Sequence, residues 1–315
     1  MSGAATGSTV VLAGGVGAAR LLAGLVQVVD PTTLTAVVNT ADDLVLHGLE
    51  ISPDLDTVTY TLAGAIDPER GWGLGGETWH AMEGLRRYGG DAWFNLGDRD
   101  LGTHLFRTAR LQAGASLSQV TAEIAAAWGL QLRLLPVTDD AIRTRVTVAD
   151  GEIGFQDYFV HRKHAVAVRA VRFEGAAEAA PAPGVLEAIA AAATVVIAPS
   201  NPIVSIGPVL AVPGVRAAVA ARRKDVVAVS PIVAGAALKG PADRLLTELG
   251  HESSVVGVAR IYAELAATLV IDAADEALAG AVEAEGLRCV VTDTIMSSPE
   301  RSAALARSVL AGGRP

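Results

Sequence analysis

The chain has one cysteine among its 315 residues, Cys289. A single cysteine forms no intramolecular disulfide, and it excludes a metal site built on several cysteines. Cys289 lies in the apolar run 287–291. A strand residue that packs in the interior is therefore favoured over a reactive nucleophile at this position.

Basic residues are also scarce. Lys and Arg number 25 against 34 Asp and Glu, which gives a formal net charge of -9 and a sequence pI near 5.2. Nucleic-acid backbones and anionic membranes both bind clustered positive charge. We therefore expect no nucleic acid and no membrane among the partners of this chain.

Long apolar runs are missing as well. No run approaches the roughly 18 apolar residues at which a membrane-spanning helix becomes a candidate. Residues 1–8 are uncharged and lack the basic segment and apolar stretch of a secretory signal. These features predict a cytoplasmic protein.

The residues that are abundant point to one fold class. Hydrophobic residues make up 51% of the chain and aromatic residues only 4%, with a strong bias to Ala, Val, Leu and Gly. This composition suits helices stacked on a parallel, Val-rich sheet. We predict an α/β fold, with a Rossmann-like and mostly parallel sheet flanked by helices.

Strand-like and helix-like segments alternate along most of the chain. Residues 136–190 differ, because short strand-like runs follow one another there without long helices. We predict a Rossmann-like nucleotide-binding core over 1–135 and 191–315, and an inserted α+β region over 136–190. Within the core we expect strands at 9–13, 34–38 and 254–258, and helices at 18–29 and 57–65.

A glycine motif, Gly14-Gly15-Val16-Gly17, follows the first strand and precedes the first helix. Its backbone N–H groups can approach a phosphate while the helix N-terminus stabilises the negative charge. The spacing is not Gly-x-Gly-x-x-Gly, and no Gly-Lys-Ser/Thr follows, so neither a dinucleotide-dependent dehydrogenase nor a P-loop ATPase is supported. Taken alone, a tight structural turn is as good an interpretation as a ligand site.

Two acidic motifs come next. Asp42-Asp43 ends the second strand, and Asp54-Leu55-Asp56 follows shortly after, so we expect both motifs in connections between elements. Carboxylate oxygens are the ligands that Mg²⁺ and Ca²⁺ prefer. Asp54 or Asp56 alone would suit a helix N-cap, whereas the two motifs together favour a metal site.

A third acidic motif, Gly97-Asp98-Arg99-Asp100, is followed by Thr103, His104 and Arg107. The fork-shaped guanidinium of Arg99 is suited to binding phosphate with two hydrogen bonds. The alternative is an Arg–Asp network that only orders the loop. His104 by itself is more typical of a packed histidine than of a catalyst.

Two later loops follow strand-like runs. Ser200, Asn201 and Ser205 come after the strand at 195–198, and Ser230 ends the next strand. In open α/β sheets ligands bind at this end of the strands, although such residues also form ordinary turns. We expect the two loops to face one crevice.

These motifs together resemble the 2-phospho-L-lactate transferase family of deazaflavin coenzyme biosynthesis, over nearly the whole chain. The resemblance rests on Gly14-Gly15-Val16-Gly17, Val38-Asn39-Thr40-Ala41-Asp42-Asp43, Ser52-Pro53-Asp54-Leu55-Asp56-Thr57, Gly71-Trp72-Gly73, Leu96-Gly97-Asp98-Arg99-Asp100-Leu101, Ala198-Pro199-Ser200-Asn201-Pro202 and Ser230-Pro231-Ile232.

The resemblance implies a Mg²⁺-dependent transferase of coenzyme F-420 biosynthesis that is a cytoplasmic homodimer. A phospholactyl or enolpyruvyl-phosphate group would pass from a guanosine-diphosphate-linked donor to the ribityl hydroxyl of the deazaflavin Fo, with release of GMP. Archaeal members use the lactyl donor and actinobacterial ones the enolpyruvyl donor. The Ala- and Arg-rich composition favours the actinobacterial, phosphoenolpyruvate type.

The resemblance also gives each motif a role. Asp42 and Asp56, with Asp43 or Asp54 assisting, would hold Mg²⁺. Asp54, Asp56 and Arg99 would be catalytic, with Asp54 orienting the ribityl hydroxyl for attack. The residues that would bind the nucleotide and Fo are Gly14, Gly15, Gly17, Asn39, Thr40, Asp98, Thr103, His104, Ser200, Asn201, Ser205 and Ser230.

The rival hypothesis belongs to another class: a non-catalytic regulator of related fold that binds a sugar nucleotide. Such a protein would need the glycine motif but has little use for the second and third acidic motifs. Their presence at 54–56 and 97–100 favours the enzyme.

Overall fold

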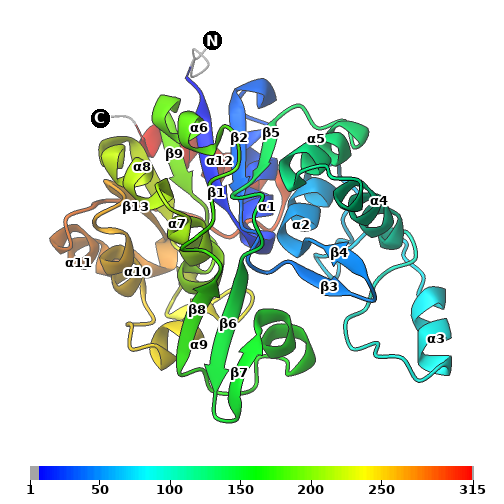
Figure 1. The fold of residues 1–315 in the computed structure, drawn as a ribbon. Helices are drawn as coiled ribbons and strands as arrows, with labels where there is room; N and C mark the ends of the chain where they lie inside the picture. Colours follow the sequence, from blue (N-terminus) through cyan, green and yellow to red (C-terminus); the bar gives the residue numbers. More distant parts are fainter. Residues whose placement is uncertain (1–6, 314–315) are drawn as a thin grey trace.

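A computed structural model describes residues 7–313, and its centre is a sheet of seven parallel strands in the order β14-β13-β10-β9-β1-β2-β5 (Figure 1). The predicted α/β class, with a mostly parallel Rossmann-like sheet, is therefore confirmed. The strands are β1 (Thr9–Ala13), β2 (Leu34–Val38), β5 (Arg133–Pro136), β9 (Thr194–Ile197), β10 (Val226–Val229), β13 (Thr268–Asp272) and β14 (Arg288–Thr292).

Helices cover both faces of this sheet because alternate strand residues point to opposite sides. In β1, Val10 and Leu12 join one hydrophobic core and Val11 and Ala13 join the other. The second core is closed by α1 (Gly15–Leu25), α2 (Pro53–Leu62), α5 (Leu117–Ala127) and α12 (Pro299–Gly312). The first is closed by α6 (Val185–Ala191), α7 (Gly207–Ala211), α8 (Val215–Ala221), α10 (Val255–Tyr262) and α11 (Ala279–Ala284).

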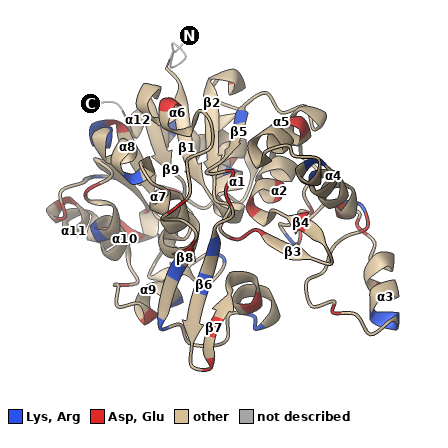
Figure 2. Ribbon diagram, viewed as in Figure 1, with Lys and Arg blue, Asp and Glu red and all other residues tan. Residues whose placement is uncertain are grey.

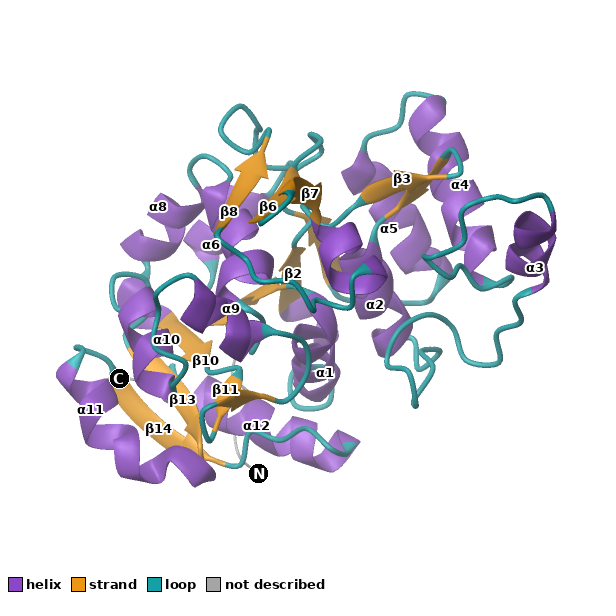
Figure 3. Cartoon of the chain, turned by 90° about the horizontal axis from the view of Figure 1, so that it is seen from below, coloured by secondary structure: helices purple, strands orange, loops and turns teal. Residues whose placement is uncertain are grey.

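Smaller elements surround the carboxyl ends of the strands. A three-stranded antiparallel sheet of order β7-β6-β8 extends beyond the main sheet, and α3 stands away from the body of the molecule (Figures 1 and 3). These elements are β3 (Leu44–Leu46), β4 (Leu49–Ile51), α3 (His80–Arg87), α4 (Asp100–Gln112), β6 (Arg143–Val148), β7 (Gly151–Gly154), β8 (Ala170–Glu174), β11 (Ile232–Val233), β12 (Ala236–Ala237) and α9 (Ala242–Glu248). Two short π-helical segments span Asp157–His161 and Pro202–Ile206.

Three of the predicted elements differ in type or extent, and one of them, the helix predicted at 18–29, begins at Gly15 and ends at Leu25. The strand predicted at 254–258 is wrong, because Ser254 caps a helix there by accepting hydrogen bonds from the N–H groups of Val256 and Gly257. A short continuous apolar run fits a buried helix as well as a buried strand. The helix predicted at 57–65 begins earlier, at Pro53.

Among residues 7–313, no single helix is both long and apolar enough to cross a membrane. One bent pair, 202–211 with 215–221, has the length and composition but turns by 96° at its break.

The contact between α1 and α12 provides a test of the packing. A Cβ placed on Gly24 of α1 would lie 2.2 Å from the Ser302 carbonyl oxygen of α12. We expect Gly24→Ala to lower the free energy of unfolding by about 1–3 kcal/mol, because backbone and not a flexible side chain occupies the space.

The matched control is Gly84→Ala in α3, where a Cβ meets nothing within 4 Å. There the higher helix propensity of Ala should leave the protein as stable or up to about 1 kcal/mol more stable. Urea denaturation measures both variants, and equal stability of the two would contradict the proposed close packing.

Candidate functional site

The candidate site lies where the parallel strands β10, β9, β1 and β2 end. From β1 the chain proceeds to β2 on one side of the sheet, and β9 later adds to the other side, so β1 and β9 flank a topological switch point. Open α/β sheets bind ligands at such points. A cavity of about 770 Å³ opens there, large enough for a nucleotide-sized ligand.

The glycine motif forms one wall of this cavity and the N-terminus of α1. Gly15 has a φ of +70°, a left-handed conformation that favours glycine. A Cβ on Gly17 would lie 2.3 Å from the Pro199 carbonyl oxygen, so the loop after β9 can approach only a glycine. The Ser200 hydroxyl donates a hydrogen bond of 2.7 Å to the Gly14 carbonyl and ties the two loops together.

The second acidic motif does not lie in a connection, as predicted, but in the first turn of α2. Ser52 is the N-cap residue and Pro53 the first helical residue, so neither Asp54 nor Asp56 is the cap. Acidic residues in a first turn interact favourably with the helix dipole. The Ser52 hydroxyl donates to Asp43 Oδ2 at 2.7 Å, which joins the end of β2 to the start of α2.

Asp42 and Asp54 are buried carboxylates that repel each other. Asp54 accepts hydrogen bonds from the Gly15 N–H at 2.9 Å and the Asn39 amide at 3.0 Å. Burial nevertheless raises the pKa of Asp54 to about 6. Burial and then the charge of Asp54 raise the pKa of Asp42 well above its usual range. No basic side chain among residues 7–313 offsets either charge within ion-pair distance.

Asp43 and Asp56, in contrast, share a buried cation. The Arg107 guanidinium of α4, whose side chain is 2% exposed, binds both carboxylate oxygens of Asp56, with Nη1 3.1 Å from Oδ2. Burial raises the pKa of Asp43 to about 8, although Arg107 and Arg143 oppose the shift. Arg107 therefore divides the four aspartates into one neutralised pair and one pair without a counter-charge.

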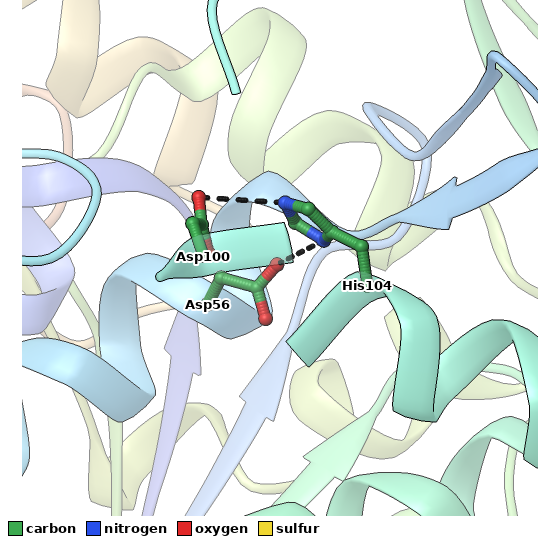
Figure 4. A group of neighbouring side chains, drawn as sticks. All are labelled: Asp56, Asp100 and His104. Atoms are coloured by element: carbon green, nitrogen blue, oxygen red, sulfur yellow. Dashed lines mark ion pairs between the residues drawn. The ribbon is translucent and has the colours of Figure 1, made fainter. Parts of the chain in front are cut away.

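His104 lies between Asp56 and Asp100 (Figure 4). Its Nδ1 is 3.8 Å from Asp56 Oδ2 and its Nε2 is 3.4 Å from Asp100 Oδ2. Burial opposes ionisation of Asp100, but the contact with His104 and a hydrogen bond of 2.5 Å from the Tyr60 hydroxyl lower its pKa overall. The hydroxyl of Thr103 faces the same Tyr60 at 2.8 Å.

This trio also has the spacing of a metal site, since one ligand atom from each residue lies within 4.8 Å of the others. It shares only Asp56 with the predicted ligands Asp42, Asp43 and Asp56. Arg107 already occupies the carboxylate of Asp56, and Mg²⁺ prefers oxygen ligands to imidazole. The trio is better explained as an ion-pair network than as a magnesium site.

The third acidic motif orders a loop. The Asp98 carboxylate accepts hydrogen bonds from the N–H groups of His80 and Ala81 at the start of α3. The exposed Arg99 side chain donates to the Gly75 carbonyl. Neither residue lines the cavity.

The predicted site residues thus fall into two groups. Those that line the cavity are Gly14, Gly15, Gly17, Asp42, Asp54, Asp56, His104, Ser200, Asn201, Ser205 and Ser230. Those that lie outside it are Asn39, Thr40, Asp43, Asp98, Arg99 and Thr103. Asn201 also caps the π-helix that follows it, and the Ser230 hydroxyl donates to the Ile232 carbonyl, so both have the turn roles considered from sequence.

Comparison with known proteins identifies the family of this chain. A family model described as 2-phospho-L-lactate transferase CofD matches residues 9–309. The chain belongs to the 2-phospho-L-lactate transferase family. It is therefore a transferase of coenzyme F-420 biosynthesis, and the resemblance stated from its motifs is confirmed.

Curated members of this family named phosphoenolpyruvate transferase are similar along their whole length. That of Kitasatospora aureofaciens is 47% identical over 309 residues, which cover 96% of each chain. That of Streptomyces griseus is 47% identical over 307 residues, again 96% of each. That of Mycolicibacterium smegmatis is 42% identical and covers 95% of this chain and 97% of the relative.

Among solved structures, protein BH3568 from Bacillus halodurans, described as a member of the UPF0052 family, has a TM-score of 0.62. It is 17% identical in sequence, and the match covers 96% of this chain and 99% of that one. At this identity the likeness shows a shared fold.

Sequence reasoning left four residues of the site without a role. Tyr60 and Asp100 line the cavity, Arg107 neutralises the acids, and the Gln156 amide donates to the Asp42 carbonyl at 3.0 Å. Helical spacing indicates two of these contacts, because residues three or four positions apart lie on the same face of a helix. Tyr60 follows Asp56 by four positions, and Arg107 follows His104 by three. No local signal connects Gln156 with Asp42.

The Arg107 pairing yields a stability prediction. Arg107→Met should lower the free energy of unfolding by about 3–5 kcal/mol at neutral pH, because the buried Asp56 carboxylate loses its ion-pair partner. The matched control, Arg110→Met on the same helix, removes an ion pair with Glu123 that is about 40% exposed and should change little. Equal unfolding midpoints in urea for the two variants would exclude Arg107 as the cation of the site.

Proposed function

We propose that this family member transfers a phospholactyl or enolpyruvyl-phosphate group from a guanosine-diphosphate-linked donor to the ribityl hydroxyl of Fo and releases GMP. The observation that carries the proposal is the cavity, which combines the glycine turn and N-terminus of α1 with two buried carboxylates that lack a counter-charge. The curated relatives named phosphoenolpyruvate transferase favour the enolpyruvyl donor.

The chemistry is a displacement at phosphorus. The ribityl oxygen forms a bond to the phosphorus that carries the three-carbon group, and the bond from that phosphorus to the GMP oxygen breaks. The hydroxyl proton passes to a carboxylate, and no covalent enzyme intermediate is required. In this proposal the helix N-terminus of α1 and the loops at Ser200 and Ser230 hold the nucleotide.

Mg²⁺ fits this cavity best between Asp42 and Asp54. Burial raises the pKa of both carboxylates, and no basic side chain among residues 7–313 lies within ion-pair distance of either. Hard oxygen ligands of this kind are the ones Mg²⁺ prefers. When bound, the ion would offset negative charge on the diphosphate.

With Asp54 assigned to the cation, we propose that Asp100 receives the hydroxyl proton instead. Asp56 is held by Arg107, whereas Asp100 lines the cavity and has His104 Nε2 3.4 Å from its Oδ2. The imidazole can share the proton, which compensates for the low pKa of Asp100. Tyr60 fixes the orientation of the carboxylate through its 2.5 Å hydrogen bond.

Incubation with Fo, Mg²⁺ and either the lactyl or the enolpyruvyl guanosine diphosphate, followed by mass spectrometry, tests the reaction. We expect a phosphodiester of Fo together with GMP, and a higher kcat/KM with the enolpyruvyl donor. A folded protein that forms no product from either donor would contradict the transferase and favour the regulator that binds a sugar nucleotide.

The metal assignment predicts pH-dependent binding that is independent of turnover. Calorimetric titration with Mg²⁺ in the presence of GDP should show affinity that falls as the pH is lowered, including the range below about 6, because protonated Asp42 and Asp54 no longer ligate a cation. Asp54→Asn should weaken binding at least about tenfold at pH 7.5. Asp150→Asn is the control, since its side chain is 83% exposed on a distant turn, and weakening of equal size in both would exclude the site.

A further inference from the structure

The charges that line the cavity are separated by sign. Four aspartates, Asp42, Asp54, Asp56 and Asp100, come from β2, α2 and α4. Three basic side chains also line the cavity, and they come from other elements: Arg20 from α1, Arg70 from the loop after α2, and Lys239 from the loop after β12. A ligand in this cavity therefore meets an acidic wall and a basic rim.

Several arginines in and near the site are paired with acids. Figure 2 shows basic residues in blue on β6 and β8, and of the arginines on these strands, Arg145 of β6 pairs with Glu174 and Arg172 of β8 pairs with Glu152. Arg70 pairs with Asp67 at 2.8 Å and lies over the rings of Trp72 and Trp79. These partners leave little positive charge for a ligand.

Arg20 and Lys239 differ, because no carboxylate among residues 7–313 lies within ion-pair distance of either. Main-chain oxygens hold both side chains instead. Lys239 Nζ donates to the Arg70 carbonyl at 3.1 Å, and Arg20 Nη1 reaches the Met296 carbonyl at 3.5 Å. Both side chains line the same cavity, and partial burial together with the positive charge of Arg20 lowers the pKa of Lys239.

The loop at Gly71 brings this pair next to the glycine motif. A Cβ on Gly71 would lie 2.6 Å from Lys239 Nζ and 3.8 Å from the Val16 side chain. Lys239 is therefore placed beside the turn at the N-terminus of α1, where the proposed donor would bind its phosphates. An anionic group attached to those phosphates would lie within reach of both cations.

We propose that Arg20 and Lys239 form an oxyanion subsite that binds the carboxylate of the donor's three-carbon group. The inference rests on the proposed function, in which the donor carries that carboxylate next to its diphosphate. Asp42 and Asp54 would hold a cation that, with the α1 N-terminus, would offset the charge of the diphosphate, whereas no basic side chain in the cavity lining other than Arg20 and Lys239 lacks an acidic partner for the carboxylate. The subsite would distinguish this donor from an ordinary nucleoside diphosphate.

The test compares two donors that differ only in this group: the natural donor and an analogue in which a methyl group replaces the carboxylate. For Lys239→Met we expect kcat/KM to fall about 10- to 100-fold with the natural donor, because a charge-assisted hydrogen bond is lost, and to change less than about threefold with the analogue. Lys224→Met, which removes an exposed lysine outside the cavity, should leave both values within about twofold.

A second pair of variants moves Lys239 without removing it. Gly71→Ala should displace the ammonium group and reproduce the donor-dependent loss. Gly64→Ala introduces similar backbone strain, with a φ of +66° against +72°, but meets nothing within 4 Å. It should lower stability without changing the ratio of the two kcat/KM values.

The outcomes separate this subsite from the transferase itself. If Lys239→Met lowers kcat/KM equally with both donors, Lys239 binds the diphosphate and not the carboxylate. If kcat/KM changes with neither donor, Lys239 does not contact the donor. Either result overturns the proposal. If the wild-type chain turns over neither donor, the transferase proposal fails, and calorimetric titration then decides the subsite. In that case 2-phospholactate should bind wild-type protein at least about tenfold more tightly than isopropyl phosphate does, and Lys239→Met should abolish the difference.

Discussion

Four aspartate carboxylates lie buried where β2 ends and α2 begins, and one guanidinium, that of Arg107, faces two of them. A charge removed from water destabilises a folded protein unless an opposite charge or hydrogen bonds replace the lost hydration. Arg107 supplies this compensation for Asp43 and Asp56. Asp42 and Asp54 have only neutral hydrogen-bond donors, so burial raises the pKa of both carboxyl groups and a bound cation would be needed to compensate their charge.

The rest of the site can be understood from this imbalance. Ser52, Asn39 and the Gly15 N–H group hold the carboxylates in place, so they are preorganised for a cation. The glycine turn and α1 N-terminus, which attract anions, lie against the same acids. One part of the cavity therefore favours anions and the adjacent part favours a cation. Such a cavity suits a phosphate-bearing substrate that binds together with a metal ion.

Close backbone approach fixes this geometry. The loop after β9 approaches α1 closely because Gly17 has no Cβ, and the backbone of α12 approaches α1 closely because Gly24 has none. The first contact brings Ser200 to the glycine turn, and the second anchors α1 against the sheet. Motif residues on separate strands are thereby brought into one cavity with little freedom to move apart.

The local pattern of residues was sufficient for most of the fold. The apolar runs at 9–13 and 34–38 are the strands β1 and β2, because β-branched residues bounded by Gly or Asn have few alternatives in a buried sheet. The strand prediction for residues 254–258 was wrong, because a continuous apolar run shows neither the two-residue period of a strand nor the 3.6-residue period of a helix. The hydrogen bonds by which Ser254 caps the segment favour the helix that the structure shows.

For the site, the sequence alone determined which residue types were available and that several of them follow strands in a parallel sheet. It placed the glycine motif and the Ser200 and Ser230 loops at one edge, because parallel strands end together. Only the tertiary structure decided which acids are neutralised. Arg107 of α4 pairs with Asp56 of α2, and the cations Arg20 and Lys239, which are far apart in the sequence, line the same cavity. Such pairings depend on distances between elements, which no local spacing of residues encodes.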